Sequence, residues 1–281
     1  MKVKITSDST CDLSPKLLER FGIELLPISV TMGEREGKDG IDIHPDDFYE
    51  YVEKSGVLPK TSATNIYEYL MFFSHWVSQG YRIVHFCLGS GFSSTCQNAQ
   101  IAAEECGNVY IVDSKNLSSG QGLLVLKGAE LTERGYSAEA IQTACSKEAP
   151  YVEASFIIDN LDYLYKGGRC NALAALGANT LHLKPCIEVQ NGVMAPTKKY
   201  RGSTERAAML YVENRLLGRT DIDAHRIFVT HTRCPDELVN RVVKRIRELV
   251  PDAEEVLETT AGATVTTHCG PNTLGVLFFR R

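Results

Sequence analysis

The first half of the chain alternates short apolar runs with longer segments in which apolar residues recur every three or four positions. Val3 and Ile5 alternate with polar neighbours, and Ser14-Pro15 offers a cap and a first-turn proline for a helix that stops at Gly22. The pattern continues with predicted strands at residues 23–32, 81–88, 108–113 and 155–159, and with predicted helices at residues 46–54, 65–79, 94–106, 122–134 and 138–148. Strands that alternate with helices of this length predict a parallel, doubly wound sheet.

The pattern changes after about residue 160. Residues 184–189 and 193–198 predict a hairpin, because the Asn191-Gly192 pair between them suits a two-residue type I′ turn. Further predicted elements are helices at residues 204–217 and 235–250 and strands at residues 226–230, 253–257 and 273–279. We therefore predict an α/β fold in which a parallel, doubly wound N-terminal domain (1–160) is followed by an α+β C-terminal domain (161–281).

Charge and composition exclude several classes of protein. The 281 residues include 30 Lys and Arg against 35 Asp and Glu, a formal net charge of −5, so no basic surface for nucleic acid is expected. No apolar stretch approaches the ~18 residues of a transmembrane segment. The first residues lack a signal-peptide pattern, which predicts a cytoplasmic protein. The nine cysteines form no CxxC pair, which predicts reduced, buried thiols and no metal site.

Common catalytic fingerprints are absent from the sequence. It contains no GxxxxGK[ST] phosphate loop, no HExxH, no EF-hand loop and no GxGxxG. A self-sufficient ATPase, a zinc protease and a dinucleotide enzyme are therefore disfavoured, and no cofactor is expected.

Hydroxyl-rich loops follow predicted strands or begin predicted helices at residues 7–10, 61–62, 89–95 and 114–122. Because the carboxyl ends of parallel strands meet at one edge of a sheet, we expect a binding site there. Hydroxyls and free helix N–H groups favour an anion such as a phosphate or a carboxylate. Ser93 and Ser94 are the strongest case, although Ser93 could instead serve only as the cap of its helix.

Among the seven histidines, His268 is the candidate site residue, because it falls in a predicted loop before the last apolar strand. Four others lie in predicted helices or strands, where a structural role is ordinary: His75, His85, His182 and His225. Two small basic loops, at residues 166–169 and 198–202, are interpreted either as solvated surface or as a docking patch for an anionic partner or a phosphate.

Taken together, these segments resemble the DegV proteins. Members of that family bind a fatty acid and, in bacteria, act as the lipid-binding partner of a separate ATP-dependent fatty acid kinase. Each matching segment is weak alone, but six in the right order make a specific match. They are Ser7–Leu13, Pro59–Ser62, Gly89–Thr95 with Gln97, Val112–Lys115 with Ser119–Gly122, Leu161–Arg169 and His268–Pro271.

The resemblance implies one acyl chain in a tunnel between two domains. It assigns the ligand's carboxylate to the hydroxyls of Thr61 and Ser93 and to the backbone N–H of Ser94. It also places the imidazole of His268 near the carboxylate. Arg169 and Arg201 match basic residues near the mouth of the site. The chain departs from the family pattern at Ala63-Thr64, Ser94, Cys96 and Asn272.

The resemblance also implies a non-catalytic carrier. Such a protein presents the carboxylate of a long-chain fatty acid to the kinase and carries the acyl phosphate to acyl-phosphate-using enzymes of phospholipid synthesis. Burial is worth about 0.8 kcal/mol per methylene, so roughly fourteen of them would contribute on the order of 11 kcal/mol before ordering costs are subtracted. Affinity is therefore expected to come from the acyl chain, and orientation from the head.

Two alternative functions stay open at this point. A Ser–His hydrolase of acyl esters or thioesters would use Ser93 as nucleophile and His268 as base. It lacks an evident carboxylate to orient the histidine, and the final glycine of a nucleophile elbow is missing. The other alternative is a phosphotransfer or sugar-phosphate enzyme of related sheet topology.

Overall fold

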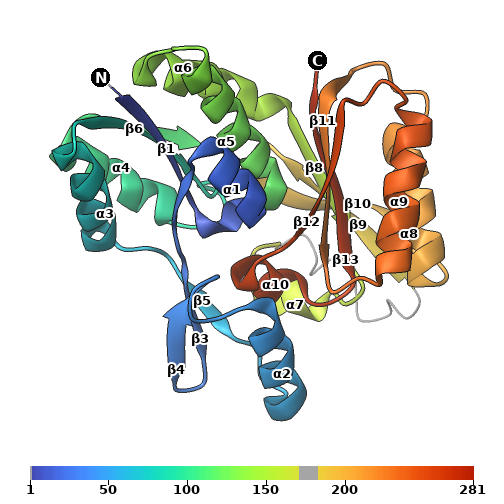
Figure 1. The fold of residues 1–281 in the computed structure, drawn as a ribbon. Coiled ribbons are helices and arrows are strands. Elements are labelled where there is room, and N and C mark those ends of the chain that lie inside the picture. Colours follow the sequence, from blue (N-terminus) through green and yellow to red (C-terminus); the bar gives the residue numbers. More distant parts are fainter. Residues whose placement is uncertain (1, 171–182) are drawn as a thin grey trace.

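The computed structural model describes residues 2–170 and 183–281, which form three sheets with flanking helices (Figure 1). The histidine at position 182 lies outside the described residues. Within these two ranges, no helix combines the length and the apolar character needed to cross a membrane.

The N-terminal sheet is parallel throughout and has helices on both faces, which confirms the doubly wound prediction. In spatial order its strands are β2 (Glu24–Leu26), β1 (Lys2–Asp8), β6 (Tyr81–Cys87) and β7 (Val109–Asp113). The helices around it are α1 (Pro15–Phe21), α3 (Ile66–Ser78), α4 (Thr95–Cys106), α5 (Ser118–Glu133) and α6 (Ala138–Glu148). Side chains of β6 alternate between the faces, so that Ile83 packs with α3 and α4, and Phe86 packs with α5.

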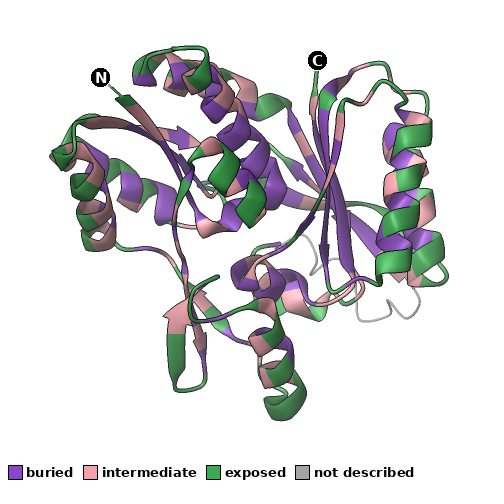
Figure 2. Cartoon of the chain, viewed as in Figure 1, coloured by how far each residue is buried: buried purple, intermediate pink, exposed green. Residues whose placement is uncertain are grey.

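The second sheet is mixed, and it confirms the predicted α+β character of the second half. In spatial order its strands are β10 (Val193–Arg201), β9 (Leu183–Gln190), β8 (Val152–Ile157), β13 (Thr273–Arg280), β11 (Ile222–Thr232) and β12 (Glu255–Thr260). Helices α8 (Thr204–Leu216) and α9 (Asp236–Leu249) cover one face, and α5 packs against the other. Helix α5 therefore lies between the two sheets and is buried along most of its length (Figure 2).

Strand β8 corrects one prediction. The alternating pattern placed a strand at residues 155–159 with the parallel sheet, but β8 pairs antiparallel with β13 and β9 of the second sheet. Its partners lie far along the chain, and local periodicity carries no information about them. The division of the chain into domains at residue 160 stays a prediction.

A small third sheet was not predicted. Its spatial order is β4 (Arg35–Lys38), β3 (Ser29–Met32) and β5 (Lys60–Ser62), and α2 (Pro45–Ser55) lies between β4 and β5 in the chain. The single strand predicted at residues 23–32 is in fact two strands, β2 and β3, in different sheets. Pro27 separates them, because proline has no N–H for a strand ladder.

Of two short helices, α10 (Ala263–Cys269) packs beside β3 and β5 of this third sheet, and α7 (Asp162–Lys166) packs against α10. His268 belongs to α10, so the prediction that it lies in a loop is wrong. Threonines occupy much of α10, at Thr264, Thr266 and Thr267, and their weak helix propensity concealed the helix from a sequence pattern.

Helix α5 begins at Ser118, before the predicted start at Gly122. A side chain at Gly122 would have no room, since its Cβ would lie 2.7 Å from the Cys11 carbonyl oxygen. Glycine at this position lets α5 approach the loop after β1, and this brings the N-terminus of α5 to the edge of the sheet.

Candidate functional site

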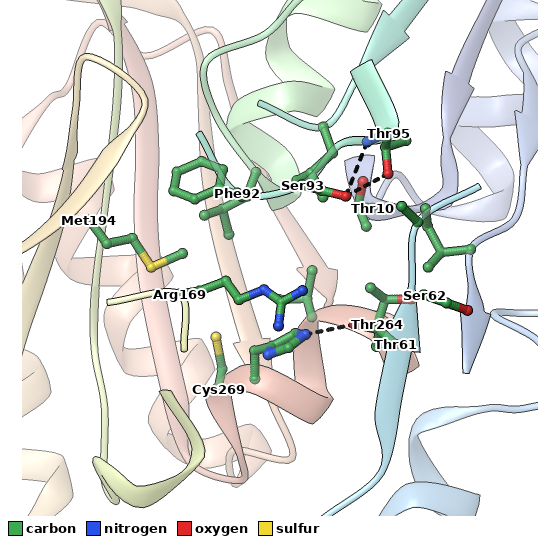
Figure 3. Close-up of a pocket in the computed structure, with 16 residues that line it drawn as sticks. Thr10, Thr61, Ser62, Phe92, Ser93, Thr95, Arg169, Met194, Thr264 and Cys269 are labelled. Carbon is green, nitrogen blue, oxygen red and sulfur yellow. Dashed lines mark hydrogen bonds between the residues drawn. The ribbon is translucent and has the colours of Figure 1, made fainter. Parts of the chain in front are cut away.

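A cavity lies where the carboxyl ends of the N-terminal strands meet β5, α10 and the segment after α7 (Figure 3). Its volume is about 560 Å³ when the open solvent at its mouth is counted. Each of the four predicted hydroxyl-rich segments contributes to its wall, but residues 61–62 belong to strand β5 of the third sheet and not to a loop at the edge of the parallel sheet. The lining residues with polar side chains are Thr10, Thr61, Ser62, Ser93, Thr95, Arg169, Thr264 and His268.

Thr61 and His268 form a hydrogen-bonded pair across the cavity wall. Thr61 Oγ1 on β5 lies 2.9 Å from His268 Nε2 on α10. Burial, reinforced by the positive charge of Arg169, lowers the pKa of His268 to about 4, so the ring is neutral at neutral pH. Its other nitrogen, Nδ1, has no hydrogen-bond partner among the described residues.

Ser93 bonds to the first residue of α4 and lines the cavity. Its Oγ accepts a hydrogen bond from the Thr95 N–H at 3.2 Å and lies 2.7 Å from Thr95 Oγ1 (Figure 3). The N-cap of α4 is Ser94, whose side chain makes no cap hydrogen bond, so the prediction of Ser93 as the cap is wrong in position, although Ser93 Oγ accepts the first N–H of the helix. The first N–H groups of α4, which begins two residues later, have no intrahelical acceptor.

The other predicted site residues, Arg169, Ser94 and Arg201, do not all line the cavity. Arg169 lines the cavity mouth, is exposed, and donates a hydrogen bond to the Gly167 carbonyl oxygen at 2.6 Å. Ser94 is exposed and its side chain is not part of the cavity wall. Arg201, also exposed, lies at the end of β10 and does not line the cavity. The structure thus brings together Thr61, Ser93, His268 and Arg169.

A second, apolar cavity lies next to the first on the side of the six-stranded sheet, with a volume of about 390 Å³ when open solvent is counted. Both cavities share Leu117, Val265 and Cys269 in their walls. Further apolar lining comes from β8, β9 and β13, through Ala154, Phe156, Val189 and Leu277.

Hydroxyl groups around this second cavity are satisfied by the protein itself. Thr232 Oγ1 donates to the Gly270 carbonyl oxygen at 2.5 Å, and Thr273 Oγ1 donates to that of Cys269 at 3.0 Å. With their polar atoms engaged, these threonines leave a wall suited to hydrocarbon.

Two buried carboxylates hold the N-terminus of α10, and sequence reasoning missed both. Asp12 Oδ1 accepts the Gly262 N–H at 2.9 Å, and Asp39 Oδ1 accepts the Ala263 N–H at 2.8 Å. Burial, and to a smaller extent the charge of Asp39, raises the pKa of Asp12 to about 7, against the lowering effect of its hydrogen bonds with Ser118 and Gly262. Asp12 lies in the Ser7–Leu13 segment, whose polar residues were the available signal.

His85 confirms its predicted structural role. It is buried, with Nδ1 2.9 Å from Thr6 Oγ1 and Nε2 3.2 Å from Asp8 Oδ1. Asp8, His85 and Cys87 place possible metal-ligand atoms within 4.8 Å of one another. Asp8 also accepts hydrogen bonds from Tyr69 and Leu88, so this cluster is a satisfied polar network of the core.

The fold and the site define an α/β protein with hydroxyl groups in the wall of one cavity and a second, apolar cavity beside it. The chain belongs to the DegV family, whose model, described as "Uncharacterised protein, DegV family", matches residues 2–281. The resemblance drawn from the sequence motifs is thereby confirmed.

Relatives cover the whole chain. A DegV domain-containing protein of Caldanaerobacter subterraneus is 27% identical over 281 residues, covering 99% of this chain and 98% of the relative. A DegV family protein from Thermus thermophilus, described by its fatty acid binding, has a TM-score of 0.87 at 25% identity and covers 100% of both chains. A stearic acid-binding protein from Eubacterium ventriosum has a TM-score of 0.84 at 25% identity and covers 100% of this chain and 98% of its own.

Proposed function

We propose that this protein binds one long-chain fatty acid, with the acyl chain in the apolar cavity and the carboxylate beside Thr61 and Ser93. The observation that carries the proposal is a mostly apolar cavity wall that includes the hydroxyls of Thr61 and Ser93, beside a second apolar cavity that shares three of its wall residues. The ligands described for the relatives from T. thermophilus and E. ventriosum support the same chemistry.

The head of the ligand meets neutral donors. A carboxylate taken out of water needs hydrogen bonds, and the Thr61 and Ser93 hydroxyls and the Ser94 N–H supply them. The neutral His268 ring, with its proton on Nε2, donates to Thr61 Oγ1 and leaves the Thr61 O–H free to donate to the carboxylate. Arg169 adds positive charge at the mouth.

We further propose that the bound carboxylate is presented to a separate ATP-dependent fatty acid kinase in the cytoplasm. The acyl phosphate is then carried to acyl-phosphate-using enzymes of phospholipid synthesis. The exposed guanidinium of Arg169 offsets the charge of the transferred phosphoryl group. Arg201, exposed at the end of β10, is a contact for the kinase, and the protein contributes no catalytic residue of its own.

The geometry favours this carrier over a Ser–His hydrolase. In the hydrolase, the serine would bond to the histidine and a carboxylate would orient the ring. Ser93 instead bonds to Thr95 and His268 Nε2 to Thr61, while His268 Nδ1 has no partner in the described part of the chain.

The proposed ligand is tested by titrating delipidated protein with hexadecanoate, hexadecan-1-ol and butyrate in a calorimeter. Hexadecanoate is expected to bind most tightly, because it combines a long chain for the apolar cavity with a carboxylate that pairs with the hydroxyls. Hexadecan-1-ol lacks the carboxylate, and butyrate lacks the long chain. Absence of hexadecanoate binding, or equal binding of butyrate, overturns the proposal. The carrier step is tested by adding the kinase and labelled ATP, which should label the bound acid and leave the protein unlabelled.

A further inference from the structure

One residue of the cavity wall carries a buried hydroxyl that the protein leaves without a partner. Thr264, on α10, is 5% exposed, and its Oγ1 has no hydrogen-bond partner among the described residues. The next threonines along α10 behave differently, since Thr266 and Thr267 donate to the Ala261 and Ala263 carbonyl oxygens at 3.3 and 2.8 Å. A buried polar atom without a partner is uncommon and points to a missing one.

The position of Thr264 indicates where that partner belongs. Thr264 and His268 are four residues apart on α10, so their side chains lie on one face of the helix, a turn apart. Both line the cavity together with Thr61 (Figure 3). The missing partner is therefore an atom inside the cavity, near the end where the ligand's head is held.

The two carboxylates at the N-terminus of α10 bond to other donors and not to Thr264. Asp12 accepts from the Gly262 N–H and Ser118 Oγ, and Asp39 accepts from the Ala263 N–H and Ser9 Oγ. A methylene group against Thr264 would leave the hydroxyl unsatisfied, whereas a ligand oxygen would accept its hydrogen bond.

We propose that the Thr264 hydroxyl is a ligand-binding group, which donates a hydrogen bond to a carboxylate oxygen of the bound acid. The proposal rests on the proposed function, and it adds to the head of the site a third hydroxyl beside those of Thr61 and Ser93. A hydrogen bond to a charged acceptor is stronger than one between neutral groups, so this hydroxyl contributes measurably to affinity.

The test compares Thr264→Val, which keeps the shape and removes the hydroxyl, with Thr264→Ser, which keeps the hydroxyl. Each delipidated protein is titrated with hexadecanoate, and its thermal midpoint is measured without ligand. We expect Thr264→Val to weaken hexadecanoate binding by about tenfold, the equivalent of one charge-assisted hydrogen bond. Thr264→Ser should restore most of the affinity.

The ligand-free midpoint separates binding from a structural role. Because the hydroxyl has no partner in the protein, ligand-free Thr264→Val should melt no lower than the wild type. A lower midpoint, or wild-type affinity in Thr264→Val, overturns the assignment of Thr264 while leaving the proposed function intact. Failure of the wild type to bind hexadecanoate instead overturns the proposed function itself.

Discussion

Thr61 and His268 are 207 residues apart in the chain, and their side chains meet with Oγ1 2.9 Å from Nε2. The contact joins β5 of the third sheet to α10, which precedes the last strand of the second sheet. This part of the cavity wall is therefore formed by segments far apart in the chain, and a substitution that displaces α10 should weaken ligand binding.

His268 should make the protein less stable in mild acid. The pKa of His268 is about 4 in the folded protein and 6.5 in the unfolded chain, so the unfolded chain binds more protons between these two pH values. Stability present above pH 6.5 is lost as the pH falls toward 4. We expect the free energy of unfolding to drop between pH 7 and pH 5 by about 1–2 kcal/mol more in the wild type than in His268→Gln. Urea denaturation at both pH values measures this, and equal drops would contradict it.

Asp12 should make the protein less stable as the pH rises, whereas His268 makes it less stable as the pH falls. Its pKa is raised from 3.8 to about 7, so the folded state holds the extra proton between these values, and stability is lost as the pH rises through 7. Asp12→Asn keeps an acceptor for the Gly262 N–H and cannot ionise. Relative to this variant, the wild type should lose about 2 kcal/mol between pH 5 and pH 8. Parallel pH profiles of the two proteins in urea denaturation would show that Asp12 does not titrate in this way.

Removal of the Ser93 hydroxyl should weaken ligand binding more than folding. Ser93→Ala loses the acceptor of the Thr95 N–H, a hydrogen bond worth about 1 kcal/mol, and one donor to the carboxylate, which predicts about tenfold weaker hexadecanoate binding by calorimetry. Ser90→Ala is the matched control. Ser90 lies in the same loop as Ser93 but outside the cavity wall, and its hydroxyl donates to Asp113 Oδ2 at 2.6 Å. The carboxylate assignment is wrong if Ser93→Ala combined with Thr61→Val leaves the affinity unchanged.

Gly167 should be intolerant of a side chain for a reason specific to the site. A Cβ there would lie 2.5 Å from His268 Nδ1, although its φ of −70° suits any residue. Gly167→Ala is expected to displace His268 and weaken hexadecanoate binding severalfold.

Gly168→Ala is the matched control for Gly167→Ala. Gly168 has open space around it but a φ of +68°, so alanine there costs about 1 kcal/mol of backbone strain and no contact. It should lower the thermal midpoint and leave the affinity close to that of the wild type. Equal affinities in the two variants would mean that the contact between Gly167 and His268 is unimportant for binding.

The sequence predicted the long, periodic elements well, because their apolar spacing is a local property. Helix α6 and the β9–β10 hairpin lie where their patterns placed them. The short strand β5 and helix α10 could not be predicted, since three residues or a run of threonines carry too little periodicity. Assignment of β8 to the second sheet depends on pairing with β13, more than a hundred residues away along the chain.

The candidate site shows the same division. Thr61, Ser93 and His268 could be named from motifs and polar loops, and the structure places them around one cavity. The hydrogen bonds that Asp12 and Asp39 accept at the N-terminus of α10 could not be predicted, because they form only where three distant segments of the chain meet. That the Thr264 hydroxyl has no partner among the described residues likewise becomes evident only in the folded structure.

Native mass spectrometry of the protein as purified tests the central claim most directly. We expect a non-covalent adduct with the mass of a long-chain fatty acid, which organic extraction removes completely to leave the mass of the bare polypeptide. A protein that carries no lipid and takes up none when long-chain acids are supplied, or one whose added mass survives extraction as a covalent acyl group, would contradict the account.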